Sequence, residues 1–141
     1  MVVSREFSWP VRVYYEDTDS AGVVYYANYL RFMERARTEW LRSMGIEQDV
    51  LREQQSVIFV VRSAQIDFMQ PARFNDALQV VSSIKDLRKA SMVFQQDIIK
   101  MDGGEPCVLC KASIRIAALR VDDMKPCPIP DDLLREISNV D

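Results

Sequence analysis

The chain has 141 residues, of which 48% are hydrophobic and 28% charged, and this predicts one globular domain spanning residues 1–141. The net charge is −3, no run approaches the ~18 apolar residues of a membrane span, and no secretory signal is visible, so we expect a cytoplasmic protein without nucleic-acid or membrane partners. The sequence contains no histidine, which excludes Ser-His-Asp and Cys-His nucleophiles, a histidine general base and histidine-ligated metals.

The first half of the chain predicts one strand and one long helix. Residues 7–15 (FSWPVRVYY) are expected to form a strand, with Pro10 near a sheet edge. From about residue 27 to 44, apolar residues recur at spacings of three and four, which predicts an amphipathic helix about 27 Å long. Gly45 is a suitable stop for that helix, and a short helical or irregular piece follows at 46–55.

The second half predicts consecutive strands with hairpin-like connections. Strand patterns cover 57–69, 77–88 and 91–101, and the DGGE turn at 102–105 leads into a further strand. A short amphipathic helix is expected at about 131–138. One long helix against five mostly antiparallel strands is an α+β architecture, and its exposed sheet edge would favour dimerisation.

Two cysteines, Cys107 and Cys110, form a CxxC pattern in the last predicted strand. In other settings this spacing indicates zinc or redox chemistry. Here the surrounding residues alternate as in a strand, and side chains three apart on a strand point to opposite faces. We therefore expect reduced structural cysteines, no metal and no cofactor.

The stretch YYEDTDSAGVVYYANY at 14–29 places three acidic side chains, Glu16, Asp17 and Asp19, just before Gly22 and the start of the long helix. In one interpretation this is a solvated loop whose aspartates cap turns or the helix. In the other, one carboxylate is a nucleophile or general base, and backbone N–H groups at the helix N-terminus stabilise an oxyanion. Such a site could hydrolyse a substrate without histidine.

The junction LRKAS at 87–91 places Arg88 and Lys89 close to Ser91 between two predicted strands. It is either a solvated hairpin tip or a phosphate clamp for a nucleotide-bearing substrate. The tyrosines of the 14–29 stretch are expected to serve core and interface packing rather than base stacking, because no basic surface accompanies them.

The stretch YYEDTDSAGVVYYANYLRFMERAR closely resembles the signature of the 4-hydroxybenzoyl-CoA thioesterase family, in particular its YbgC-like branch of acyl-CoA thioesterases linked to the Tol–Pal envelope system. FVVRSAQIDFMQPARFND and MKPCPIP also resemble that branch, so the resemblance covers most of the chain. It implies a hotdog fold, in which an antiparallel sheet wraps a long central helix. It also implies dimers or homotetramers with active sites at the dimer interface.

The resemblance assigns roles to individual residues. The second aspartate of the D-x-D pair, Asp19, is the implied catalytic carboxylate, and the backbone N–H of Tyr26 is the implied oxyanion donor. Arg88, Lys89 and Ser91 would contact the nucleotide end of CoA. The YbgC-like branch commonly has a histidine at position 26, whereas the 4-hydroxybenzoyl-CoA enzymes carry tyrosine there. We expect this position to contribute mainly its backbone N–H.

Taken together, the residues and the resemblance predict hydrolysis of acyl-CoA or acyl-carrier-protein thioesters, with Asp19 as nucleophile or as general base. The alternative is a non-catalytic hotdog module that binds acyl thioesters or envelope-biogenesis partners. Another hotdog class, the acyl-thioester dehydratases, depends on a catalytic histidine, and the absence of histidine argues against it.

Overall fold

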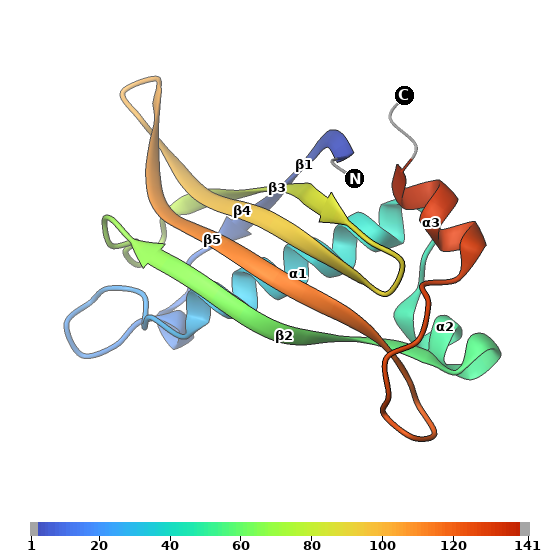
Figure 1. Ribbon diagram of the computed structural model, residues 1–141. Coiled ribbons are helices and arrows are strands. Elements are labelled where there is room, and N and C mark those ends of the chain that lie inside the picture. Colours follow the sequence, from blue (N-terminus) through green and yellow to red (C-terminus); the bar gives the residue numbers. More distant parts are fainter. Residues whose placement is uncertain (1–2, 139–141) are drawn as a thin grey trace.

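The computed structural model describes residues 3–138, and its framework is one long helix with a five-stranded sheet (Figure 1). The main elements are β1 (Val3–Arg12), α1 (Asn28–Ser43), β2 (Val57–Phe68), β3 (Ala77–Leu87), β4 (Ser91–Asp102) and β5 (Glu105–Arg120). The shorter elements are a 3-10 helix η1 (Tyr15–Asp17), α2 (Gln48–Gln55) and α3 (Asp131–Ser138). Most of these bounds agree with the predicted ranges to within a few residues.

The start of the chain differs from the prediction of a strand over 7–15. β1 ends at Arg12, and the chain then turns into η1. The cause is local, because the Tyr14 N–H donates to the Asp17 carboxylate at 2.8 Å instead of extending the strand ladder. The tyrosines of this segment therefore belong to a loop and not to the sheet.

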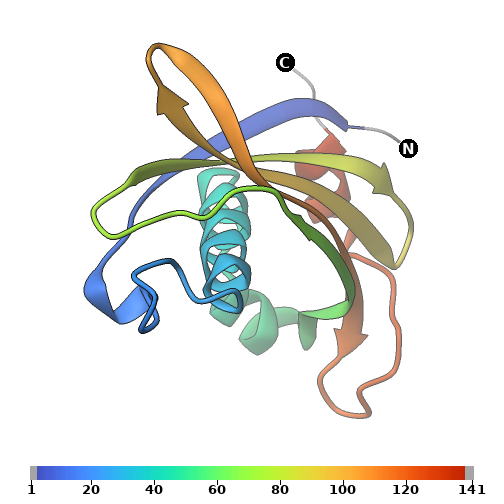
Figure 2. The ribbon, with the colours of Figure 1, turned by 90° about the vertical axis from the view of Figure 1, so that its left-hand side faces the viewer.

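The sheet has the strand order β1-β3-β4-β5-β2, and every neighbouring pair is antiparallel. β1 and β2 are its two edges. The sheet curves around α1, which Figure 2 shows nearly end-on beneath the strands. The expected α+β architecture with a wrapped central helix is confirmed.

The core lies between α1 and the inner face of the sheet. Phe32, Met33 and Ala36 of α1 are fully buried. Their spacing places them on one face of the helix, as expected for an amphipathic helix against a sheet. The Trp40 ring meets Phe94 of β4 edge to face, with centroids 5.9 Å apart. Burial of each large apolar side chain contributes about 1.5–3 kcal/mol, so this face fixes the position of α1.

A buried polar cluster also joins α1 to the sheet. The Gln96 side chain is fully buried, and its Nε2 donates to the Met33 carbonyl at 3.0 Å and to Ser82 Oγ at 2.9 Å. Its Oε1 accepts from Arg37 Nη1 at 2.8 Å. Buried polar groups need such partners, and here one amide of β4 satisfies groups on α1 and β3.

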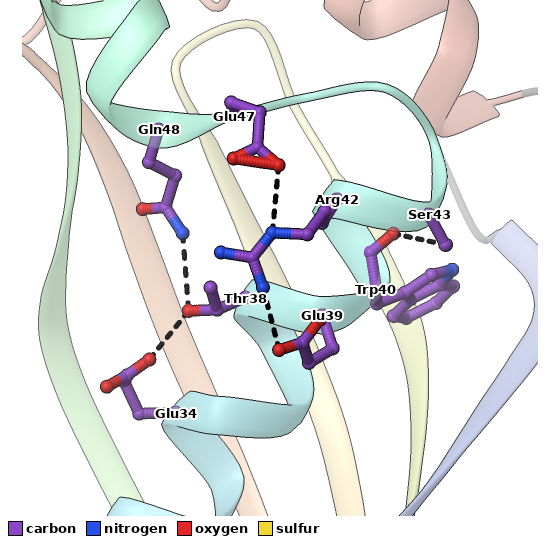
Figure 3. Close-up of polar contacts among 8 residues, drawn as sticks. All are labelled: Glu34, Thr38, Glu39, Trp40, Arg42, Ser43, Glu47 and Gln48. Atoms are coloured by element: carbon purple, nitrogen blue, oxygen red, sulfur yellow. Dashed lines mark hydrogen bonds and ion pairs between the residues drawn. The ribbon is translucent and has the colours of Figure 1, made fainter.

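The outer face of α1 is tied to the start of α2. Arg42 Nη1 donates to Glu39 at 2.7 Å and Arg42 Nε to Glu47 at 2.8 Å, as Figure 3 shows. In the same view Gln48 Nε2 donates to Thr38 Oγ1 at 3.4 Å. Exposed ion pairs contribute at most ~1 kcal/mol each, so their main effect is to orient these side chains.

The expectation that Cys107 and Cys110 lie on opposite faces is wrong. The register pairs Ile98 with Cys110 and Ile99 with Val108, so Leu109 is an extra residue between them. A bulge of this kind changes the alternation of faces, and the simple count along the strand no longer holds. Both thiols are free, as expected, and within residues 3–138 no group of three or more metal-ligating side chains comes together.

Candidate active site

Asp17 anchors the loop that connects β1 to α1. Its side chain is only 5% exposed. One carboxylate oxygen accepts the Tyr14 N–H and the other accepts the Asn28 side-chain amide, both at 2.8 Å. Its backbone carbonyl accepts the Tyr25 N–H, also at 2.8 Å. Asp17 therefore connects the end of β1 to the segment around Tyr25 and to Asn28, the first residue of α1.

Asp19 lies in the exposed turn beyond this anchor. The Gly22 N–H donates to the Asp19 carbonyl at 3.0 Å, and the Ala21 N–H donates to Asp19 Oδ1 at 2.9 Å. Gly22 has a φ of +80°, a conformation that other residues adopt at a cost, so the glycine suits this turn. Asp19 Oδ2 has no hydrogen-bond partner among residues 3–138. The turn thus orients the carboxylate with one oxygen and leaves the other open.

Tyr26 lies at the entrance to α1, two residues before its first helical residue. Within the described part of the chain, no acceptor pairs with the Tyr26 N–H. The two arms of the loop run side by side, because Thr18 and Val24 form an antiparallel bridge and the Asp19 N–H donates to the Val23 carbonyl at 2.9 Å. The structure therefore brings an open carboxylate and an unpaired N–H into the same short loop.

A pocket of about 260 Å³ opens beside Tyr26, and we call it the Tyr26 pocket. Its wall is mostly apolar and aromatic, and its lining residues include Val24, Tyr26, Tyr29, Phe68 and Met69. Phe68, the last residue of β2, meets the Tyr26 ring at right angles with centroids 6.3 Å apart. The pocket suits an apolar or aromatic group of modest size.

Tyr29 holds the first turn of α1 against the segment after β2. Its buried hydroxyl accepts the Ala72 N–H at 3.0 Å, and burial raises the pKa of Tyr29. Sequence reasoning missed this contact, and it predicted that Asp17 shapes the loop without predicting that its carboxylate is buried. The signal for Asp17 was an asparagine at the start of the predicted helix, since a buried carboxylate needs donors and Asn28 is a nearby one.

The other tyrosines of the 14–29 stretch only partly follow the expectation of packing. Tyr29 is buried, but four others are exposed: Tyr14, Tyr15, Tyr25 and Tyr26. Tyr15 stacks in parallel on Phe74, with centroids 3.8 Å apart. Among the five tyrosines, Tyr29 alone is buried in the core of the protomer.

Arg88, Lys89 and Ser91 do not join this site within one protomer. They lie at the β3–β4 turn, where Arg88 pairs with Asp86 at 2.8 Å and the Lys89 carbonyl accepts the Ile129 N–H at 2.7 Å. Arg12 pairs with Ala77 at the other end of β3, next to the Asp19 loop. β3 has 11 residues, so ten steps of about 3.3 Å make about 33 Å along the strand. Figure 1 shows the β3–β4 turn and the loop between β1 and α1 at opposite ends of the sheet.

Comparison with known proteins places this chain in a family. The model of the thioesterase-like superfamily matches residues 13–137. The chain is 41% identical over 132 residues to the acyl-CoA thioesterase YbgC of Haemophilus influenzae, covering 94% of both chains. It is 42% identical over 130 residues to the acyl-CoA thioester hydrolase YbgC of Escherichia coli, covering 92% of this chain and 94% of the relative. These matches confirm the resemblance to the YbgC-like branch.

Solved structures agree in fold. A probable thioesterase from Bartonella henselae is 34% identical with a TM-score of 0.82, covering 89% of this chain and 100% of the other. The 4-hydroxybenzoyl CoA thioesterase of a Pseudomonas species is 21% identical with a TM-score of 0.86, covering 94% and 99% of the two chains. The predicted hotdog fold is thereby confirmed. From its match over residues 13–137 and these relatives, the chain belongs to the thioesterase-like superfamily.

Proposed function

We propose that this chain hydrolyses acyl-CoA thioesters in the loop between β1 and α1. The chain is an acyl-CoA thioester hydrolase, and relatives with that name match it over more than nine-tenths of its length at 41% and 42% identity. The observation that carries the proposed site is the pairing of two features in one loop. These are the open Oδ2 of Asp19 and the unpaired N–H of Tyr26 at the start of α1.

In the proposed mechanism the thioester carbonyl oxygen accepts the Tyr26 N–H, and the N-terminus of α1 adds its partial positive charge. As nucleophile, Asp19 Oδ2 adds to the carbonyl carbon, the C–S bond breaks, and CoA leaves as a thiolate. Water then hydrolyses the mixed anhydride and regenerates the carboxylate. Losing one oxyanion donor typically costs about 3 kcal/mol of transition-state stabilisation.

As general base, Asp19 instead takes a proton from water, whose oxygen adds to the carbonyl carbon. Collapse of the tetrahedral intermediate expels the thiolate, which receives that proton. In both routes the side chain at position 26 takes no part in proton transfer. A tyrosine in place of the histidine of the YbgC-like branch is therefore compatible with turnover, because every residue other than proline supplies the same backbone N–H.

The Tyr26 pocket supports placing the acyl group beside this N–H. Its aromatic wall and its volume of about 260 Å³ favour a compact acyl group over a long chain. The carrier that holds the acyl group is CoA in this proposal, and acyl carrier protein stays a prediction. Localisation in the cytoplasm and a link to the Tol–Pal system also stay predictions. Among the described residues, no helix is long and apolar enough to cross a membrane.

Binding of the CoA nucleotide by Arg88, Lys89 and Ser91 requires more than one copy of the chain. These residues lie about 33 Å along β3 from the end where the Asp19 loop begins, since β3 has 11 residues. A second copy would have to supply them to a given site. This supports a homo-oligomer, either a dimer or a tetramer, and the open edge of β2 offers a place to form it.

The test compares Asp19→Asn with Glu16→Gln across a panel of acyl-CoAs. We expect Asp19→Asn to abolish release of free CoA while its circular dichroism and oligomeric mass stay those of the parent. Glu16→Gln removes an exposed acid from the same loop and should keep the parent rate. Parent-like turnover in Asp19→Asn would remove Asp19 from the chemistry. Binding without hydrolysis by the parent protein would instead favour the non-catalytic module.

A further inference from the structure

The proposed oxyanion donor, the Tyr26 N–H, shares a planar peptide group with the Tyr25 carbonyl. The group is trans, so its N–H and its carbonyl point in opposite directions. The Asn28 N–H donates to the Tyr25 carbonyl at 2.8 Å, which turns this carbonyl toward the first residue of α1. The Tyr26 N–H therefore points away from Asn28, and its direction depends on how firmly Tyr25 and Asn28 are held.

Three hydrogen bonds of 2.8 Å close a ring through this peptide group, which we call the Asp17 ring (Asp17, Tyr25 and Asn28). The Tyr25 N–H donates to the Asp17 carbonyl, and the Asn28 N–H donates to the Tyr25 carbonyl. These two bonds join backbone groups, which nearly every residue type supplies. The third bond runs from Asn28 Nδ2 to Asp17 Oδ1, so it is the one that depends on side chains.

The side-chain bond of the Asp17 ring is shielded from bulk water, because Asp17 is only 5% exposed and Asn28 is 7% exposed. Packing and capping hold the turn at Tyr25 only weakly. Tyr25 and Tyr26 are 46% and 63% exposed, and Ala27, which precedes α1, forms no side-chain cap. Removing the Asn28 amide would leave a buried carboxylate short of a donor, a costly state that a movement of the turn would relieve.

The Asp17 ring also joins the two arms of the loop that carry the proposed chemistry. Asp17 precedes Asp19 by two residues, and Asn28 follows Tyr26 by two. An oxyanion donor acts only when it lies about 2.7–3.1 Å from the position that the oxyanion will occupy. A small displacement of the turn would therefore weaken stabilisation of the transition state while leaving the other contacts of the substrate in place.

We propose that Asn28 is a positioning residue for thioester hydrolysis, whose amide acts through Asp17 to aim the Tyr26 N–H at the oxyanion. Asn28 itself is buried and touches no substrate. The inference rests on the proposed function, because it needs the Tyr26 N–H to be the oxyanion donor. Since the oxyanion develops only on the way to the transition state, loss of the amide should lower kcat and leave substrate binding unchanged.

The experiment compares Asn28→Ala with the parent on the acyl-CoA that the parent hydrolyses fastest. We expect kcat to fall by about 10-fold or more, short of the ~100- to 1000-fold typical of losing an oxyanion donor outright, because the N–H is displaced but present. Affinity for the matching alkyl-CoA thioether, which has no carbonyl, should stay that of the parent. Ser82→Ala is the control, because it removes a buried acceptor of Gln96 far from the loop and should keep the parent kcat.

Exchanging the two side chains separates positioning from a general loss of structure. In Asp17→Asn with Asn28→Asp, the amide at 17 can donate to the carboxylate at 28, while its oxygen still accepts the Tyr14 N–H. This double variant should recover most of the parent kcat. Asn28→Asp alone sets two buried carboxylates against each other and should lose turnover as Asn28→Ala does.

Infrared spectroscopy reads the donor directly. Asp19→Asn is loaded with an acyl-CoA that carries carbon-13 in its thioester carbonyl, and a hydrogen bond from the Tyr26 N–H should lower the stretching frequency of that carbonyl. Adding Asn28→Ala should reduce this shift, whereas adding Ser82→Ala should preserve it. A shift that is unchanged by Asn28→Ala would show that the amide does not aim the donor.

Each outcome decides the proposal. Parent-like kcat in folded Asn28→Ala, or an equal loss of kcat in Ser82→Ala, would overturn the positioning role and leave the proposed function standing. A parent protein that hydrolyses no acyl-CoA would overturn both. If Asn28→Ala does not fold, Asn28→Gln replaces it, because its longer side chain keeps an amide in a displaced position and is expected to lose kcat in the same way.

Discussion

Replacing Asp17 by alanine should destabilise the protein much more than replacing its exposed neighbour Glu16. The Asp17 carboxylate is 5% exposed and accepts two hydrogen bonds of 2.8 Å, from Tyr14 and Asn28. A hydrogen bond to a charged group contributes about 1.5–3 kcal/mol, and the two donors would also lose their partner. We therefore expect the free energy of unfolding to fall by about 3–5 kcal/mol, a large part of the ~5–15 kcal/mol typical of a domain.

Urea unfolding followed by circular dichroism measures this loss, with the slope of the transition unchanged. Glu16→Ala is the control and should stay within about 0.5 kcal/mol of the parent. The double variant Asp17→Asn with Asn28→Asp tests the geometry, because the amide at 17 can then donate to a carboxylate at 28. It should recover much of the stability that Asp17→Asn alone loses. A loss below about 1 kcal/mol for Asp17→Ala would show that the carboxylate is no anchor.

Two further predictions concern buried polar groups and thiols. Tyr29→Phe leaves the buried Ala72 N–H without its 3.0 Å acceptor. Urea unfolding should therefore show a loss of about 1–3 kcal/mol in the free energy of unfolding. An unchanged midpoint would mean that water replaces the hydroxyl. Burial raises the pKa of Cys110 to about 12, so at pH 8 only about one molecule in 10,000 carries its reactive thiolate. A thiol reagent should therefore modify the half-buried Cys107 first in the native protein, and mass mapping of early Cys110 labelling would contradict this.

Periodicity sufficed to predict α1 and the strand series, because both are set by which face each side chain buries. Features that depend on a specific side-chain contact or on an inserted residue escaped it. The strand predicted to reach residue 15 stops at Arg12, since alternation along the chain does not reveal that a carboxylate takes the Tyr14 N–H. The bulge at Leu109 was equally hidden, because an inserted residue looks like any other in a strand.

The candidate site shows the same division. The resemblance distinguishes Asp19 from Glu16 and Asp17, and the fold adds that Asp17 is buried whereas Asp19 is exposed in the turn. The distance between the Asp19 loop and Arg88 depends on the pairing of β1 with β3, which composition cannot predict. The family resemblance suggested the roles of these residues. The sheet topology determines which of them can lie in the same site within one protomer.

The buried amide of Gln96 has a consequence for how the sheet folds. Gln96 pairs with Ser82 across β3 and β4, and its three hydrogen bonds form in that alignment alone. Shifting β4 by one residue would turn this amide outward, bring a neighbour such as Gln95 into the core and leave Arg37 without any acceptor. The mispaired sheet would bury polar atoms that nothing satisfies. Gln96 therefore selects against competing strand alignments during folding, in addition to the alternation of buried apolar side chains.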